Sequence, residues 1–254
     1  MLILRRMFGR KWILTTLLVF IGSAVCIRLG IWQLDRLEGR RAFNEQVTSM
    51  RAMPPLDLTR EQPENLTSME WRHVTVTGTY DFENQIALRN QYYGSQYGYH
   101  LITPLRLADT SPALSAGSRA VLVDRGWIPA DGNSAPSDWR KYDEQGPANV
   151  TGQIRLGQSK PALGGVADAL PANGQRLMIW NNLDLPRISE QSPYPLMNVY
   201  VQPNVDAADT EPPIAFQPDV ELTEGSHFGY ALQWFTFALI LFVGYPFYLR
   251  KQGT

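Results

Sequence analysis

The chain has 254 residues, 44% of them hydrophobic, and a formal net charge of −1. This length allows one or two domains. All 24 acidic residues lie between Asp35 and Glu224 together with 16 of the 23 Lys and Arg residues, so this middle part carries a charge of −8. Its acidity, and the location outside the cytoplasm inferred below, exclude nucleic acid as a partner. The single cysteine, Cys26, lies in an apolar stretch, which excludes disulfides and thiolate metal sites in the middle part.

Two long apolar segments, residues 12–34 and 227–249, bracket the acidic part. Each has about the 20 residues with which a helix crosses the hydrocarbon core of a membrane, so membrane lipid is an expected partner. Basic flanks stay in the cytoplasm. We therefore expect residues 1–11 and 250–254 in the cytoplasm of a bacterium, two helices in its inner (plasma) membrane, and residues 35–226 as a periplasmic domain. The basic residues of these flanks are Arg5, Arg6, Arg10, Lys11, Arg250 and Lys251.

A cleaved export signal is the alternative for the first segment. Arg5-Arg6-Met7-Phe8 resembles a twin-arginine pattern, and residues 13–27 have the length of a signal-peptide core. Residues 29–34 nevertheless remain mostly apolar, and no clean processing site follows them. These features favour a retained anchor.

The acidic middle part has mainly strand character. A polar helix continues the first span to Met53 and stops at Pro54-Pro55. A short helix is expected at residues 183–190, and the Pro-rich residues 203–218 are expected to form a tether to the second span. The sequence therefore predicts an α+β membrane protein, in which two transmembrane helices bracket a β-rich domain with short helices, built as an antiparallel sheet or partial barrel. The expected strands are residues 72–80, 85–89, 98–107, 119–128, 150–156 and 197–201.

Residues 121–128 are apolar on both alternating faces, which predicts a central, buried strand. Gly126 in this strand would let another backbone segment approach closely. For Arg125 we expect a structural role as an ion-pair partner, either of neighbours of Asp124 or of Glu70.

Enzyme motifs are missing from the sequence. It contains no HExxH, CxxC, Gly-rich phosphate loop or GxSxG pattern. We therefore expect no catalytic residues and no enzymatic activity. This absence also argues against an exported hydrolase, and the lack of a cytoplasmic output domain argues against a sensor.

Three histidines could carry chemistry. His73 and His100 lie in or beside expected strands, where a half-buried, hydrogen-bonded histidine is the common case. His227 lies at the outer mouth of the second span. There it is either an ordinary interfacial residue or an axial ligand of a haem iron.

Aromatic residues accompany His227. Tyr230 and Trp234 follow it at i+3 and i+7 and share its helix face, and Trp32 lies at a similar depth in the first span. They form either an aromatic belt at the membrane interface or a flat wall suited to a porphyrin. Arg28, one turn deeper, would pair either with a haem propionate or with Asp35.

Four sequence blocks together resemble one family, and they cover nearly the whole chain in order. They are Gly30-Ile31-Trp32-Gln33-Leu34-Asp35-Arg36, Gly98-Tyr99-His100-Leu101-Ile102-Thr103-Pro104-Leu105, Leu122-Val123-Asp124-Arg125-Gly126-Trp127-Ile128-Pro129, and His227-Phe228-Gly229-Tyr230-Ala231-Leu232-Gln233-Trp234-Phe235. The chain resembles the Surfeit locus 1 family of cytochrome c oxidase assembly proteins.

The resemblance implies an assembly factor that binds haem a transiently and helps it reach the catalytic core subunit of a haem-copper oxidase. It implies His227 as the haem ligand, and haem a synthase as a further partner. Gly225-Ser226 before the histidine and Phe228-Gly229 after it depart from the family pattern, which puts the shape of its surroundings in doubt. The alternative is an interaction scaffold that stabilises an assembly intermediate without binding haem.

Overall fold

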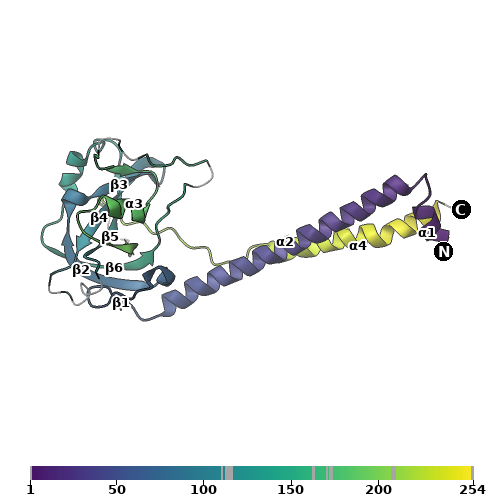
Figure 1. The fold of residues 1–254 in the computed structure, drawn as a ribbon, viewed down its shortest axis with the longest axis horizontal. Coiled ribbons are helices and arrows are strands. Elements are labelled where there is room, and N and C mark those ends of the chain that lie inside the picture. The colour runs from purple at the N-terminus through teal and green to yellow at the C-terminus, as the bar shows by residue number, and fades with distance from the viewer. Residues whose placement is uncertain are drawn as a thin grey trace. The chain divides into compact units, whose positions relative to one another are not determined.

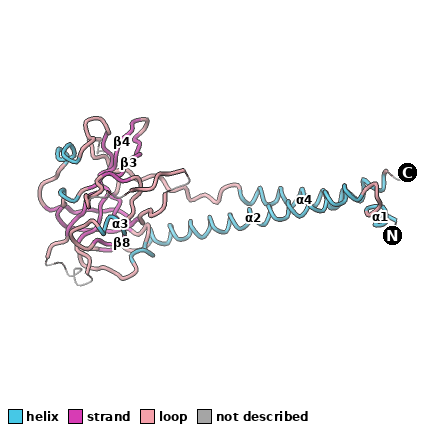
Figure 2. Tube along the Cα trace, turned by 45° about the horizontal axis from the view of Figure 1, so that its top comes forward, coloured by secondary structure: helices cyan, strands magenta, loops and turns pink. Residues whose placement is uncertain are grey.

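The computed structural model describes residues 2–109, 111, 117–161, 164–169, 171, 174–206 and 210–252 (Figures 1 and 2). The chain divides into two compact units. One unit, the helical unit, combines residues 1–46 with residues 220–254, and the other, the β unit, consists of residues 47–219. Each unit is described by itself.

Two long helices form the helical unit, together with a short N-terminal helix, α1 (Leu2–Met7), that the sequence did not predict. α2 (Ile13–Ala52) and α4 (His227–Lys251) lie side by side (Figures 1 and 2). They are antiparallel, because Thr16 contacts Tyr245 near one end of the pair and Gln33 contacts His227 near the other. α2 is unbroken to Ala52, which confirms the predicted polar extension of the first span.

The contact between α2 and α4 follows a regular spacing. One series of buried or half-buried positions of α2 recurs at intervals of three and four residues, the spacing of a coiled-coil seam. Small residues in the seam allow close packing: a Cβ atom on Gly30 would lie 2.6 Å from the ring of Phe235. These positions are Thr16, Val19, Ser23, Cys26, Gly30, Gln33 and Leu37.

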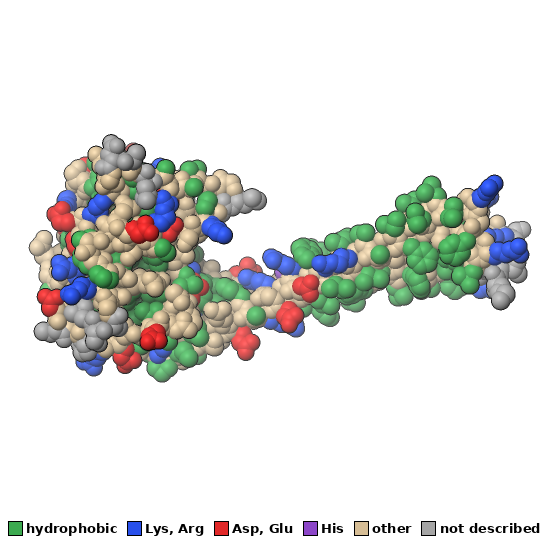
Figure 3. Space-filling model, viewed as in Figure 1, with side chains coloured by type: hydrophobic (Ala, Val, Ile, Leu, Met, Phe, Trp, Pro, Cys, Tyr) green, Lys and Arg blue, Asp and Glu red, His purple; other side chains and the backbone are tan. Residues whose placement is uncertain are grey.

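Both helices are long and apolar enough to cross a membrane. Only 17% of the most apolar 18-residue window of each helix is buried, whereas the core helix of a soluble protein would be mostly buried. Apolar side chains cover much of the visible surface of the pair (Figure 3). This exposure is consistent with a membrane protein, because large exposed apolar surfaces are rare on soluble monomers.

The β unit is a closed sheet. Five strands form a ring in the order β2-β6-β8-β5-β4, closed by the pairing of Thr79 and Tyr80 in β2 with Arg106 and Leu105 in β4. β1 extends the sheet beyond β2, and β3 and β7 extend it beyond β4. The strands are β1 (Leu56–Asp57), β2 (His73–Tyr80), β3 (Ile86–Tyr93), β4 (Gln96–Arg106), β5 (Ala120–Pro129), β6 (Pro147–Arg155), β7 (Ile179–Trp180) and β8 (Leu196–Pro203).

The core of the β unit fills the inside of this ring. β5 is buried from Ala120 to Ile128, as its two apolar faces predicted. One face points into the ring, and the other is covered by β7 and by α3 (Leu185–Glu190). Inward-facing side chains come from all five ring strands: Val74, Val76, Leu105, Val121, Val123, Val150, Ile154, Val199 and Val201.

The structure confirms the predicted α+β class, the six expected strands and the short helix, and it adds two features. The sheet is mixed rather than antiparallel, because β5 pairs with β8 in parallel. The expected tether also does not run free along its whole length: Ile214 is buried and forms an isolated bridge with Trp127 of β5. Gly126 permits this contact, since it has φ +118° and a Cβ atom there would lie 2.3 Å from the Ile214 carbonyl oxygen. Residues 207–209 of the expected tether lie outside the described residues.

Candidate functional site

His227 is the first residue of α4, and its ring contacts α2. Its Nδ1 atom lies 2.8 Å from Oε1 of Gln33. A carbonyl oxygen only accepts hydrogen bonds, so Nδ1 donates its proton, and the lone pair of the neutral ring lies on Nε2. Within the described residues, no hydrogen bond is formed by Nε2. Metal-ligating histidines commonly have this arrangement, in which the second ring nitrogen donates to an oxygen that fixes the tautomer.

Polar contacts to the polar extension of α2 hold the segment that precedes α4. The Arg41 guanidinium donates to both carboxylate oxygens of Glu224, at 2.8 and 2.9 Å. Arg40 donates to the Glu221 carbonyl oxygen, and Asn44 to that of Leu222. Gly225 then turns the chain into the helix with φ +67°. The hydrogen bond and charge of Arg41 lower the pKa of Glu224, so this clamp remains charged at neutral pH.

The aromatic residues predicted around His227 lie beside it in the helical unit. Trp32 and Tyr230 are 46% and 50% exposed, and Trp234 is half-buried. At about 100° per residue, Trp32 and Tyr230 project from the same flank of the antiparallel pair, opposite the flank on which Gly30 contacts Phe235. Phe237 stacks edge-on against Trp234 with ring centroids 6.0 Å apart. The flank thus presents flat, accessible aromatic surface on the two helices that carry Gln33 and His227.

Two arginines belong to the same flank. Arg28 and Arg36 stand four residues to either side of Trp32, and both are exposed. Among the described residues, Arg28 forms no ion pair with Asp35, so the structure does not support that alternative partner. Trp32, Tyr230, Trp234, Arg28, Arg36 and His227 are called the imidazole flank below.

The imidazole flank fits a haem group in its donor set. It offers one oriented imidazole nitrogen for iron, aromatic faces for the macrocycle and cations for the propionates. Its exposure suits a cargo that is taken up and released rather than a permanently enclosed cofactor. Among the described residues, no cluster of three or more His, Cys, Asp or Glu side chains could hold another metal ion.

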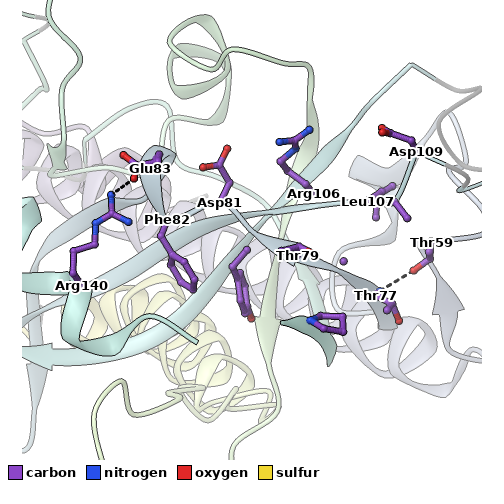
Figure 4. Close-up of a pocket in the computed structure, with 14 residues that line it drawn as sticks. Thr59, Thr77, Thr79, Asp81, Phe82, Glu83, Arg106, Leu107, Asp109 and Arg140 are labelled. Carbon is purple, nitrogen blue, oxygen red and sulfur yellow. Dashed lines mark hydrogen bonds and ion pairs between the residues drawn. The ribbon is translucent and has the colours of Figure 1, made fainter. Parts of the chain in front are cut away.

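The β unit contains a groove of about 650 Å³ beside the pairing that closes the ring (Figure 4). Its charged side chains are largely engaged within the domain. Glu83 pairs with Arg140 at 2.5 Å. Asp81 accepts hydrogen bonds from Asn84 and from the Tyr194 hydroxyl, at 2.7 and 2.6 Å. Burial, and then the hydrogen bond to Asp81, raise the pKa of Tyr194. The described residues that line the groove contain no arrangement of nucleophile and base.

Arg125 is buried and structural, as expected, but Glu70, which we named as a candidate partner, does not pair with it. Its guanidinium pairs with Glu144 at 2.7 Å, whereas Glu70 pairs with Arg155 at 3.2 Å. The guanidinium also lies over the ring of Tyr80, at 5.3 Å. Burial, and then the Glu144 charge, raise the pKa of Tyr80 to about 12. Glu144 lies in the connection that precedes β6, and only the tertiary course of this connection brings it close to Arg125.

His100 differs from the half-buried residue that the sequence predicted. It is 5% exposed, and its Nδ1 lies 2.9 Å from a carboxylate oxygen of Asp124 on the neighbouring strand. Burial alone would lower the pKa of His100, but the charge and hydrogen bond of Asp124 outweigh it and raise the pKa. His73, the other strand histidine, is half-buried as expected.

Gln33 is the contact residue that the sequence did not single out for the site. Gln33 and His227 are 194 positions apart, and only the antiparallel register of α2 and α4 brings them together. The available signal was depth: Gln33 and His227 both lie at the outer ends of the apolar segments.

Fold and flank together define a class: a chain with two candidate membrane-spanning helices, a closed β-rich domain between them in sequence, and an oriented histidine at the start of the second helix. Comparison with known proteins then gives the family. Residues 20–239 match the SURF1 family. The chain therefore belongs to the SURF1 family, whose members are known in general as cytochrome oxidase assembly factors rather than as enzymes.

Relatives from distant organisms match over most of their length. A SURF1-like protein of Rickettsia conorii is 26% identical and covers 93% of this chain and 92% of its own. Surfeit locus protein 1 of Arabidopsis thaliana is 24% identical over 93% of this chain and 78% of its own. A SURF1-like protein of Monosiga brevicollis is 25% identical over 90% of this chain and 85% of its own. Family membership was thus predicted correctly from the four sequence blocks.

Proposed function

We propose that this protein is an assembly factor for a haem-copper terminal oxidase, cytochrome c oxidase, and that it binds haem a transiently and delivers it to the catalytic core subunit. Membership of the SURF1 family supports the assembly role. The observation that carries the haem role is the hydrogen bond between His227 and Gln33, which leaves Nε2 available on an open flank.

The residues of the imidazole flank take distinct parts in this proposal. His227 Nε2 is the axial ligand of the haem iron, and Gln33 orients the ring. Trp32, Tyr230 and Trp234 pack against the macrocycle, and the exposed Arg28 and Arg36 pair with the propionates. Haem a is cargo, whose redox-active iron serves the oxidase. A single protein ligand on an accessible surface allows the core subunit to take it, and haem a synthase is the proposed supplier.

The location follows from the charge pattern. We place both termini in the cytoplasm, α2 and α4 across the bacterial inner membrane, and the β unit in the periplasm.

A visible spectrum tests the haem role. The full chain is expressed in cells that make haem a and is purified in mild detergent. We expect a Soret band that disappears in His227→Ala, because the axial nitrogen is lost. His73→Ala is the matched control, since it removes a half-buried histidine of the β unit. An unchanged Soret band in His227→Ala would remove His227 from the role.

Substitution of Gln33, which orients the His227 ring, provides an independent test of the haem role. Gln33→Leu keeps the ligand but removes its hydrogen-bond partner, and such changes lower metal affinity by about 10–100-fold. Haem titration of the purified variant measures this directly. Unchanged affinity would show that the contact does not serve the ligand.

A scaffold without haem is the second candidate, and one observation favours it. The hairpin of β3 and β4 carries three exposed aromatics: Tyr92, Tyr93 and Tyr97 are 61%, 45% and 36% exposed. Residues 90–99 include no charged side chain. Aromatic residues are enriched in protein interfaces. A haem-free preparation that co-purifies with oxidase subunits, and loses them in Tyr92→Ala, would support this candidate.

A further inference from the structure

A small apolar cavity lies at the other end of the helical unit, where α1 packs against α4. Its volume is about 260 Å³. Leu4, Phe20 and Phe242 are exposed, so the cavity opens to the surroundings of the helices. Its lining comes from three helices and includes Leu4, Val19, Phe20, Phe242, Tyr245 and Pro246.

Hydrogen bonds hold α1 in place as one wall of this cavity. Thr16 Oγ1 lies 2.8 Å from the Met7 carbonyl oxygen and 2.6 Å from the Tyr245 hydroxyl. Arg6 donates to the Leu249 carbonyl oxygen at 3.0 Å. Met7 and Tyr245 are buried against each other. Since the Tyr245 hydroxyl is bonded to Thr16, the lining that remains is apolar.

The cavity lies next to a cluster of cations. The chain has no acidic residue before Asp35 or after Glu224. Lys and Arg side chains lie at this end of the helical unit (Figure 3). A cationic cluster beside a membrane span attracts anionic lipid, by about fivefold in affinity for each cation. The cluster consists of Arg5, Arg6, Arg10, Lys11 and Arg250.

We propose that this end of the helical unit binds an anionic phospholipid, with part of one acyl chain in the cavity and the headgroup among the cations. The cavity is smaller than the roughly 300–1,000 Å³ pockets that enclose whole small molecules, so it takes a chain segment. A zwitterionic lipid could fill the cavity equally well, but its headgroup has no net charge to match the cluster. The site is independent of the haem role, because it uses none of the residues of the imidazole flank.

Native mass spectrometry tests the proposal on the full chain in mild detergent. The protein is exchanged with phosphatidylglycerol or with phosphatidylcholine of the same acyl chains. We expect one phosphatidylglycerol retained per chain and loss of the phosphatidylcholine. Equal retention of the two lipids, or retention of neither, would overturn the proposal.

Variants test separately how the cavity and the cations contribute to lipid retention. Val19→Phe fills the cavity and should abolish retention, whereas Val25→Phe, at a 51% exposed position of α2, should not. Leu4→Gln is a second cavity variant, at a 62% exposed residue whose replacement does not disturb packing. Arg10→Gln and Arg250→Gln should each lower phosphatidylglycerol retention by about fivefold. Cavity variants that retain the lipid as Val25→Phe does would contradict the site.

Discussion

His100 and His227 show at the residue scale how a neighbour decides what a histidine does. Both place Nδ1 within 3 Å of a side-chain oxygen, at 2.9 and 2.8 Å. His100 is buried against a carboxylate, which favours its protonated form. His227 is half-exposed against an uncharged amide, which leaves Nε2 for a ligand. The first arrangement is structural, and the second is the one on which the proposed haem ligand rests.

The raised pKa of His100 makes the stability of the β unit depend on pH. The folded state binds this proton more tightly than the unfolded chain, whose histidine has the ordinary value of 6.5. The stabilisation is therefore complete below pH 6.5 and is lost as pH rises through the raised pKa. Asp124→Asn should remove this slope and cost about 1.5–3 kcal/mol at low pH.

Denaturant unfolding at a series of pH values, followed by tryptophan fluorescence in detergent, measures this prediction. Asp131→Asn, at an exposed turn position, is the control and should keep the slope. Parallel pH profiles for Asp124→Asn and the unaltered protein would contradict the assignment.

Close packing between elements governs the element scale, and in the helical unit Gly30 of α2 packs against the Phe235 ring of α4. Gly30→Leu would drive a side chain into the Phe235 ring, since even a Cβ atom would lie 2.6 Å away. Overpacking of this kind costs about 1–3 kcal/mol. We expect a lower melting temperature in detergent, measured by circular dichroism. Gly39→Leu on the same helix has nothing within 4 Å and should leave it unchanged. Equal effects of the two changes would show that α2 and α4 do not pack as described.

Gly126 has the corresponding role in the β unit. Trp127 and Ile214 exchange two backbone hydrogen bonds, of 2.8 and 2.9 Å. Gly126→Ala would place Cβ against the Ile214 backbone and strain a positive φ, at a cost of about 1–3 kcal/mol. The Ile214 amide should then exchange its hydrogen faster. Gly132→Ala, with φ +69° and open space around it, separates strain alone from the clash. Protection of Ile214 that survives in Gly126→Ala would exclude the close approach.

At the scale of the whole molecule, two apolar helices that are consecutive spans place the two ends of the chain on one side of a membrane. Basic flanks predict that this side is the cytoplasm. Alkaline phosphatase, which is active only after export, should be active when fused after residue 206 and inactive when fused after residue 252. A green fluorescent protein fused after residue 252 should fluoresce. An active phosphatase at the C-terminal position would refute the orientation.

Much of the fold could be predicted from local patterns. Alternating apolar residues marked β2 and β6, and the doubly apolar run of β5 marked a buried strand. These signals work because the side chains of a strand alternate between two faces. Local patterns do not contain the pairing of distant strands, so the closure of β2 on β4 and the parallel pair of β5 with β8 could not be predicted.

The candidate site likewise contains residues that local patterns indicated and residues that only the tertiary structure identified. Position and spacing placed His227, Tyr230, Trp234, Trp32 and Arg28 at one depth or on one face, and the family resemblance then implied His227 as the haem ligand. The roles of Gln33 and Arg36 needed the antiparallel register of two helices, which no single segment contains.

The sequence by itself determined the two apolar helices, the acidic β-rich part between them and the family, since each is a property of composition or of short patterns along the chain. Tertiary structure alone decided the partners of individual side chains: Gln33 for His227, Asp124 for His100, Glu144 for Arg125 and Ile214 for Trp127. The physical reason is the short range of these interactions. A hydrogen bond or ion pair acts over a few ångströms in space, and only the folded chain sets which distant residues come that close.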